Sequence, residues 1–370
     1  MNDIFSLADD LGPFKVIHVQ EPSIGLKGVL VIDNVARGPS IGGVRMAVDV
    51  TTEECARLAR AMTFKNAAAG LPHGGGKAAL VGDPNMPVEQ KEELIRGFAC
   101  ALREAEQYIF APDMGTDETC MAWVKDEINR VVGLPREMGG IPLDEIGATG
   151  WGLSQAIKVA MDFCPLETSS ARFVVQGFGA VGKHVSRILS QDGASAIAVS
   201  DSSGTIYNAN GLDVEQLIAL KTEGNPVTDY RDGETLEGDA IIDVDCDIWI
   251  PAARPDVIHE GNVHRLSTKM LVQGANIPIT YAAEKILHEK DILSIPDFIA
   301  NAGGVICAAM EYQRSSEAAV MSSIAEKLAR NTLEVLETAK RESILPRDAA
   351  LAMARSRLEE AMSFRRWKLF

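Results

Sequence analysis

Short apolar runs alternate with amphipathic stretches of helical length in the first third of this chain. Residues 29–32, Val-Leu-Val-Ile, have the unbroken apolar character of a buried strand, and the glycine-rich segment 38–43 that follows predicts a turn. Thr51 with Glu54 three positions later forms a capping box, which predicts the start of a helix that ends at Gly70. The pattern is typical of an α/β domain.

The pattern changes near residue 147. From Arg172 the order is strand, glycine turn, helix and strand, which predicts a βαβ unit. Further apolar runs at 248–250, 271–273 and 292–294 suit a parallel sheet, because helical or turn-rich stretches separate them. The end of the chain is predicted to be helical, in two segments on either side of Pro346.

We therefore expect an α/β fold of two domains with a cleft between them. Residues 1–148 would form an N-terminal α/β substrate-binding and oligomerisation domain, and residues 149–341 a Rossmann dinucleotide-binding domain. The terminal helical stretch, 342–370, is expected to pack on the first domain. Helical structure is expected from about Ala302 to Arg341 and again from Arg347 to Met362.

Composition narrows the class of protein. The 370 residues carry a formal charge of −16, which argues against unspecific binding to nucleic acid or to an anionic membrane. The six cysteines are scattered without a metal-ligand or disulfide spacing, so we expect reduced thiols, no metal site and a cytoplasmic location. No signal peptide and no apolar run of membrane-spanning length is visible.

A dinucleotide-binding motif occupies residues 177–182. The sequence Gly-Phe-Gly-Ala-Val-Gly directly follows a predicted strand and precedes a predicted helix, whose N-terminus would bind the pyrophosphate. Asp201 ends the next strand about 20 residues further on, where an acid binds the ribose hydroxyls. This acid favours NAD, whereas Ser202 and Ser203 leave NADP possible because their hydroxyls could donate to a 2′-phosphate. The predicted cofactor-binding residues of the motif are Gly177, Phe178, Gly179, Ala180, Val181 and Gly182.

Three charged residues of the first domain are candidates for chemistry. Lys77 follows three glycines and lies among small apolar residues, so we expect partial burial, which makes an amine useful in acid–base work. A solvated surface position is the alternative for Lys77 and for Lys65. Asp113 follows an apolar strand, and by itself is more simply interpreted as a cap for a helix beginning near Thr116.

Four segments carry a family resemblance that decides between these readings. Residues 62–67 (Met-Thr-Phe-Lys-Asn-Ala), 71–77 (Leu-Pro-His-Gly-Gly-Gly-Lys), 111–116 (Ala-Pro-Asp-Met-Gly-Thr) and 295–305 resemble the glutamate/leucine/phenylalanine/valine dehydrogenase family. The dinucleotide motif lies where that family has it, so the resemblance covers almost the whole chain.

The resemblance implies an NAD(P)-dependent oxidoreductase that deaminates an L-amino acid to a 2-oxo acid and ammonia, reversibly. Lys65 would bind the α-carboxylate, Lys77 would activate water, and Asp113 would transfer protons to and from the amino group. Gly42, Gly43 and Met62 would line the substrate, and relatives are mostly homo-oligomers. The further cofactor contacts implied or expected are Thr149, Ala252, Asn276 and Asn301.

The side-chain pocket departs from the glutamate-specific pattern. In glutamate enzymes of the family a lysine precedes the Gly-Gly pair and a serine assists it, whereas this chain has Ile41 and Ala308 there. Burying a carboxylate without its cation is costly, while Ile41, Met62, Val305 and Ala308 would favour an apolar side chain. We therefore expect a leucine-, valine- or phenylalanine-type substrate.

Two alternatives stay open. One is a glutamate dehydrogenase whose carboxylate site is rebuilt with Arg45 or His73; His73 could instead only cap its loop. The other is a catalytically silent NAD-binding protein, against which the joint presence of Lys65, Lys77 and Asp113 argues.

Overall fold

The computed structural model describes residues 5–237 and 239–370, which form two compact units. The first unit comprises the described residues up to Leu143 together with Val305–Val320 and Leu351–Phe370. The second comprises Asp144–Gly304 and Met321–Ala350. The division that we expected, 1–148 with 342–370 against 149–341, differs mainly at Val305–Val320, which packs with the first unit.

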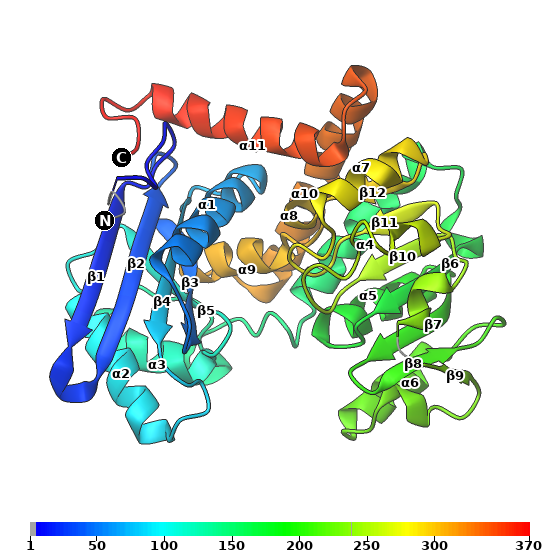
Figure 1. Ribbon diagram of the computed structural model, residues 1–370, viewed down its shortest axis with the longest axis horizontal. Helices are drawn as coiled ribbons and strands as arrows, with labels where there is room; N and C mark the ends of the chain where they lie inside the picture. The colour runs from blue at the N-terminus through cyan, green and yellow to red at the C-terminus, as the bar shows by residue number, and fades with distance from the viewer. Residues whose placement is uncertain (1–4, 238) are drawn as a thin grey trace. The chain divides into compact units, whose positions relative to one another are not determined.

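The first unit is built on a five-stranded sheet with the order β1-β2-β4-β3-β5 (Figure 1). Strands β3, β4 and β5 are parallel, β2 pairs antiparallel with β4, and β1 pairs antiparallel with β2 at the edge of the sheet. The strands are β1 (Lys15–Glu21), β2 (Leu26–Asn34), β3 (Ser40–Ala47), β4 (Gly74–Val81) and β5 (Tyr108–Pro112).

Side-chain alternation places different helices on the two faces of this sheet. Val29 and Val31 of β2 pack with Cys55 and Ala59 of α1 (Thr52–Ala68), so α1 covers one face. Leu30 and Ile32 pack against α2 (Val88–Ala101) and α3 (Glu118–Ile128) on the other. Lys77 of β4 and Gly43 of β3 lie on the α1 face. The residues next to them in each strand belong to the core on the opposite face, and successive side chains of a strand point to opposite faces.

The predicted start and end of α1 are confirmed. The Thr51 hydroxyl accepts the N–H of Glu54 at 3.1 Å, and Gly70 takes a left-handed φ of +65° just after the helix. The turn predicted at 38–43 is wrong in its second half, since Gly42 and Gly43 lie inside β3. A Cβ at Gly42 would lie 1.8 Å from the Gly76 oxygen, so this glycine serves close strand packing instead of a turn.

The second unit contains a seven-stranded sheet with the order β12-β11-β10-β6-β7-β8-β9. The strands from β12 to β7 are parallel, as predicted, and β8 and β9 add an antiparallel edge. They are β6 (Arg172–Gln176), β7 (Ser195–Asp201), β8 (Gly204–Tyr207), β9 (Glu234–Leu236), β10 (Ile248–Pro251), β11 (Met270–Val272) and β12 (Leu293–Ile295).

The helices of the second unit include α4 to α8. They are α4 (Ala148–Ala160), α5 (Ala180–Gln191), α6 (Val214–Thr222), α7 (Tyr281–Glu289) and the short α8 (Asp297–Ala300).

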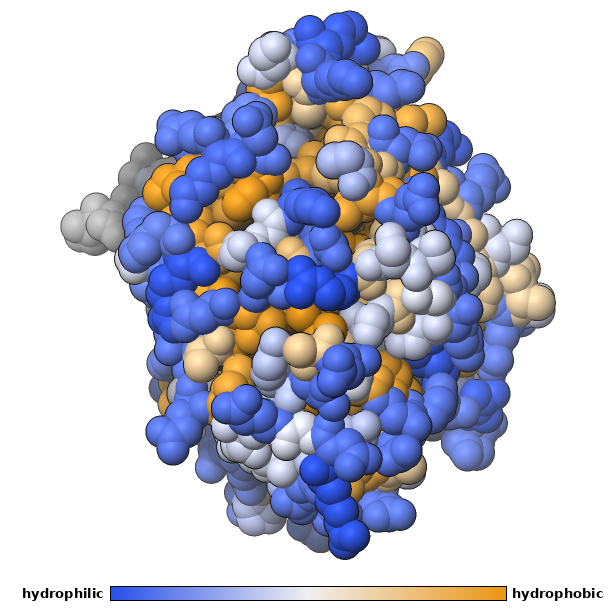
Figure 2. Space-filling view, turned by 90° about the vertical axis from the view of Figure 1, so that its right-hand side faces the viewer, coloured by the Kyte–Doolittle hydropathy of each residue, from blue (hydrophilic) through white to orange (hydrophobic). Residues whose placement is uncertain are grey.

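Figure 2 shows one face of the molecule, where hydrophilic residues predominate and hydrophobic residues are visible between them. This surface agrees with the formal charge of −16.

The C-terminal part holds three more helices, and two of them share the stretch 302–341 that the sequence predicts to be helical. The structure has α9 (Gly303–Tyr312) and α10 (Glu317–Glu342), separated where Arg314 takes a left-handed φ of +58°. Helix α11 (Pro346–Ser363) follows, and its Leu358 and Met362 pack on Leu11 in the first unit. Among the helices of the described ranges, none is long and apolar enough to cross a membrane.

Candidate active site

A buried ion pair on the α1 face is the centre of the site in the first unit. Lys77 Nζ lies 2.8 Å from Asp113 Oδ2, and the two side chains are 7% and 21% exposed. Arg45 donates its Nε to the same carboxylate oxygen at 3.0 Å and its Nη1 to Glu54 at 2.7 Å. Partial burial of Lys77 is therefore confirmed, and the surface alternative for it is wrong.

The electrostatics of Asp113 follow from these neighbours. Burial by itself would raise the pKa of Asp113, but the nearby cations of Lys77 and Arg45 outweigh burial and lower it. Asp113 is thus held as a carboxylate. It is not a helix cap, because Asp117 caps α3 by accepting the N–H of Cys120 at 2.9 Å.

The glycines next to the pair let backbone and side chains approach closely. A Cβ at Gly43 would lie 2.6 Å from Asp113 Cβ, and one at Gly75 would lie 2.0 Å from the Thr63 nitrogen of α1. These close approaches bring α1, with Met62 and Lys65, against the strands that carry the ion pair. Met62 and Lys65 are both half-buried.

Ile41 lies beside this pair on the same face. It is paired in register with Gly75, two residues before Lys77, and it is buried with 3% of its surface exposed. Arg45, four residues further along β3, is already bound to Asp113 and Glu54. The side chain at the position where the resemblance implies a lysine in glutamate-specific enzymes is therefore apolar and buried.

His73 is fixed in its loop, as one of the two interpretations expected. Its Nδ1 lies 3.0 Å from the Pro39 oxygen, and its ring stands edge-on to Tyr312 of α9 with centroids 6.1 Å apart. Burial lowers the pKa of His73, which favours the neutral ring. Its Nε2 is buried and has no hydrogen-bond partner among the residues that the structure describes.

Helix α9 presents Val305 and Ala308 on a half-buried face. Glu311, one turn further on, accepts the N–H groups of Gly133 at 2.8 Å, Leu134 at 3.1 Å and Ile141 at 3.0 Å. This buried carboxylate fixes α9 to the segment 133–141. Glu311 could not be predicted from the sequence, because an acid within an apolar helix gives no signal of which backbone amides it contacts.

The dinucleotide motif of the second unit forms the predicted strand–turn–helix. Gly177 takes φ +105°, where a Cβ would lie 2.7 Å from that of Ala253, next to Ala252. Gly179 precedes α5 with no side-chain cap, and its Cβ position is open, with no atom within 4 Å. The residues fit a pyrophosphate, because the open glycine and the uncapped amides of α5 form an anion-binding site. The remaining motif residues are Phe178, which is buried, Ala180 and Val181 in the first turn of α5, and Gly182, against the Gly177 oxygen.

Asp201 lies at the end of β7 as predicted, but its carboxylate is already occupied. Oδ1 accepts the N–H of Ser203 at 2.8 Å, and Oδ2 accepts the N–H of Val227 at 3.0 Å and lies 2.7 Å from Lys221 Nζ. Ser202 and Ser203 are exposed beside it. Lys221 of α6 was not foreseen, because it lies 20 residues away along the chain.

Asn276 and Asn301 lie together in the second unit. Asn301 Nδ2 donates to Asn276 Oδ1 at 3.0 Å and to the Ala275 oxygen at 3.1 Å. Asn301 Oδ1 is buried without a hydrogen-bond partner within the described part of the chain, so a ligand donor would satisfy it. Thr149 is near Gly304, whose Cβ would lie 3.4 Å from Thr149 Oγ1.

Comparisons with known proteins identify the family of this chain. The family described as Glutamate/Leucine/Phenylalanine/Valine dehydrogenase matches residues 139–366, and the Glu/Leu/Phe/Val dehydrogenase dimerisation domain matches residues 13–130. The chain belongs to this family: it is an amino acid dehydrogenase, an oxidoreductase acting on CH–NH2 donors, of a family that uses NAD(P).

Individual relatives include two named glutamate dehydrogenase. That of Aeropyrum pernix is 36% identical over 90% of this chain and 85% of its own length. That of Thermotoga maritima is 40% identical over 77% of this chain and 72% of its own length. A solved hetero-hexameric glutamate dehydrogenase from Thermus thermophilus, in a leucine-bound form, is 28% identical with a TM-score of 0.82 and covers 94% of this chain and 89% of its own.

Proposed function

We propose that this chain catalyses the reversible NAD(P)-dependent oxidative deamination of an L-amino acid to a 2-oxo acid and ammonia. The buried Lys77–Asp113 pair, beside glycines that let a ligand approach, is the observation that carries the proposal. When bound, the nicotinamide supplies the acceptor for the hydride that leaves the substrate α-carbon.

The proposed roles use the charges that the structure places. Lys65 binds the α-carboxylate, and Lys77 stabilises negative charge and orients the attacking water. Asp113, held ionised by Lys77 and Arg45, accepts a proton from the amino group and returns one later. Gly43 keeps this face of β3 open for the substrate backbone, and Gly42 allows the close packing of β3 against β4.

The named relatives and the pocket residues favour different classes of substrate. Both curated relatives are named glutamate dehydrogenase, which favours glutamate over the apolar substrate expected from the sequence. The pocket residues support the opposite choice: Ile41 is apolar, Arg45 is already bound to two carboxylates, and burial favours a neutral His73. We therefore propose an apolar L-amino acid and retain glutamate as the second candidate.

A substrate panel separates the two candidates. Leucine, valine, phenylalanine, tryptophan and glutamate are compared by kcat/KM from reduced-cofactor absorbance, in the wild type and in Ile41→Lys. We expect the wild type to prefer an apolar substrate and Ile41→Lys to shift the ratio toward glutamate by about 10-fold or more, since the new cation would pair with the side-chain carboxylate. Glutamate as the best wild-type substrate would overturn the apolar proposal and leave the deamination proposal intact.

The surroundings of Asp201 bear on the cofactor. Both carboxylate oxygens already have partners, and Lys221 adds a positive charge at the position that a 2′-phosphate would approach. We therefore propose that NADP is accepted alongside NAD, in contrast to the simple preference for NAD that Asp201 predicts from sequence. The family's dimerisation domain and the hetero-hexameric neighbour support an oligomer, and we propose a homo-oligomer as the working assembly.

A further inference from the structure

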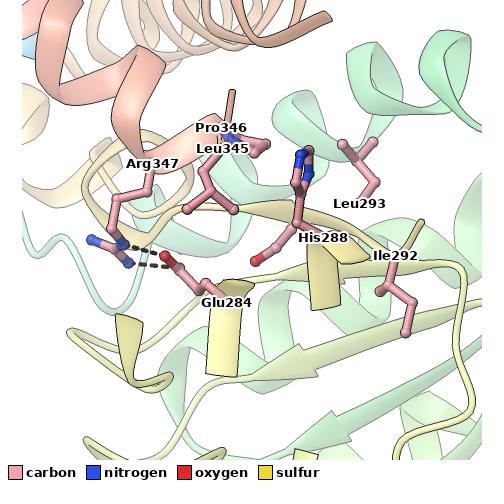
Figure 3. A pocket seen from close by; sticks show the side chains of 8 residues that line it. Glu284, His288, Ile292, Leu293, Leu345, Pro346 and Arg347 are labelled. Carbon is pink, nitrogen blue, oxygen red and sulfur yellow. Dashed lines mark hydrogen bonds and ion pairs between the residues drawn. The ribbon is translucent and has the colours of Figure 1, made fainter. Parts of the chain in front are cut away.

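Arg347, in the first turn of α11, is bound to four polar atoms of the second unit. Its Nε and Nη2 donate to Glu284 of α7 at 2.5 and 2.9 Å, and Nη2 also donates to Gln273 Oε1 at 3.1 Å and to Asp297 Oδ1 at 3.0 Å. Figure 3 shows the Arg347 and Glu284 side chains pointing toward one another. The side chains of Glu284 and Asp297 are 3% and 9% exposed, so Arg347 is the cation that balances two buried acids.

Asp297 extends this network toward the backbone beside Asn276. While Oδ1 accepts from Arg347, Oδ2 accepts the N–H of Ile277 at 2.9 Å. Ile277 has φ +51°, a left-handed conformation that a β-branched residue rarely adopts. The hydrogen bond to Asp297 therefore helps to hold a strained residue in place, directly after Asn276.

Asp297 also reaches Asn301. Its backbone oxygen accepts the N–H of Asn301 at 2.8 Å, where α8 ends. Asn301 in turn donates to Asn276, and its buried Oδ1 lacks a partner within the described ranges. Asp297 is thus bound to both segments that present the asparagine pair, through its carboxylate to Ile277 and through its backbone oxygen to Asn301, and Arg347 fixes the orientation of that carboxylate.

We propose that Arg347 is a positioning residue for the nicotinamide half of the cofactor, acting through Asp297 on Asn276 and Asn301. This inference rests on the proposed function and on the role that the family resemblance implies for Asn276 and Asn301, which is to hold the nicotinamide ribose and carboxamide. Arg347 touches no reacting atom. Lysine at this position would keep the charge but lose the planar fork that reaches Glu284, Gln273 and Asp297 together.

The test compares two ligands that share the adenine half. Dissociation constants of NADH and of ADP-ribose, which lacks nicotinamide, are measured by calorimetry for the full-length wild type and for Arg347→Lys. We expect Arg347→Lys to weaken NADH by about 10-fold, which corresponds to about 1.4 kcal/mol, and to leave ADP-ribose within about 2-fold. The matched control is Arg265→Lys, which alters another arginine of this unit bound to two carboxylates, Asp239 and Asp243, and should change neither constant.

A rescue variant distinguishes positioning from general damage. Glycine adopts φ +51° without strain, so adding Ile277→Gly to Arg347→Lys should restore part of the lost NADH affinity. If Arg347→Lys does not fold, Asp297→Asn, which keeps the side-chain size, is measured in its place with the same expected selectivity. An equal loss of affinity for NADH and ADP-ribose, or no loss of affinity for either ligand, would overturn the inference. A wild type that binds neither ligand would instead overturn the proposed function.

Discussion

Asp113→Asn tests the electrostatic centre of the site. The substitution keeps the shape of the side chain but removes the charge that balances Lys77, which is only 7% exposed. Removing one partner of a buried ion pair costs about 3–5 kcal/mol. Because Asp113 is itself 21% exposed and Arg45 retains Glu54, we expect about 2–4 kcal/mol of lost stability.

Glu54→Gln is the matched control for this variant. It makes the same acid-to-amide change on the other carboxylate bound to Arg45, but the Glu54 side chain is 39% exposed. An exposed pair contributes about 0–1 kcal/mol, so the control should remain close to the wild type. Both variants are compared by denaturant unfolding at one protein concentration, with kcat measured on the same preparations.

The pH dependence gives a second measure with a defined sign. Because the pKa of Asp113 is lowered in the folded state, its contribution to stability is complete above the unfolded-state value of about 3.9. That contribution is lost as the pH falls toward the lower folded-state pKa. The stability difference between wild type and Asp113→Asn should therefore be constant near neutrality and shrink below about pH 4.

Activity should fall more than stability explains. At a pH and temperature where Asp113→Asn is fully folded, we expect kcat to drop by at least about 10²-fold, as for loss of a general base. Equal destabilisation by Asp113→Asn and Glu54→Gln would refute the buried pair. Unchanged turnover in folded Asp113→Asn would refute its role as a proton carrier.

Three further predictions follow from other parts of the structure. Lys221→Met should lower kcat/KM for NADP by about 10-fold or more and have little effect on kcat/KM for NAD. The control Lys158→Met, which removes another lysine–aspartate pair of the unit, should change kcat/KM for neither cofactor. Glu311→Gln should remove the acceptor for the Ile141 N–H and lower the free energy of unfolding, measured with denaturant, by about 1–3 kcal/mol. A decrease no larger than that caused by Glu317→Gln, at an exposed ion pair, would contradict this role. Gly43→Ala should reduce kcat at least about 10-fold, because the new Cβ would lie 2.6 Å from Asp113 Cβ and displace the carboxylate. An unchanged kcat would show that the strand accommodates the methyl group without moving Asp113.

Local patterns predicted the elements whose signals lie within a few residues. The Thr51 cap, the Gly70 stop and the strand–turn–helix around 177–182 each depend on neighbouring side chains or on a backbone angle that glycine permits. Glycine spacing gave a wrong prediction where the glycine is required by contact with a strand that is distant in the sequence. The segment 38–43 looked like a turn, but Gly42 is needed because the Gly76 oxygen of β4 leaves no room for a Cβ.

Local patterns in the amino-acid sequence were thus sufficient to predict the fold class, the glycine-rich dinucleotide motif and, from several motifs in order, the family. The folded chain was needed to identify the ion-pair partners of three acids: Lys77 and Arg45 for Asp113, Lys221 for Asp201, and Arg347 for Asp297. The physical reason is that a side chain's electrostatics depend on burial and on charges within a few ångströms, and these partners lie 20 to 68 residues away along the chain.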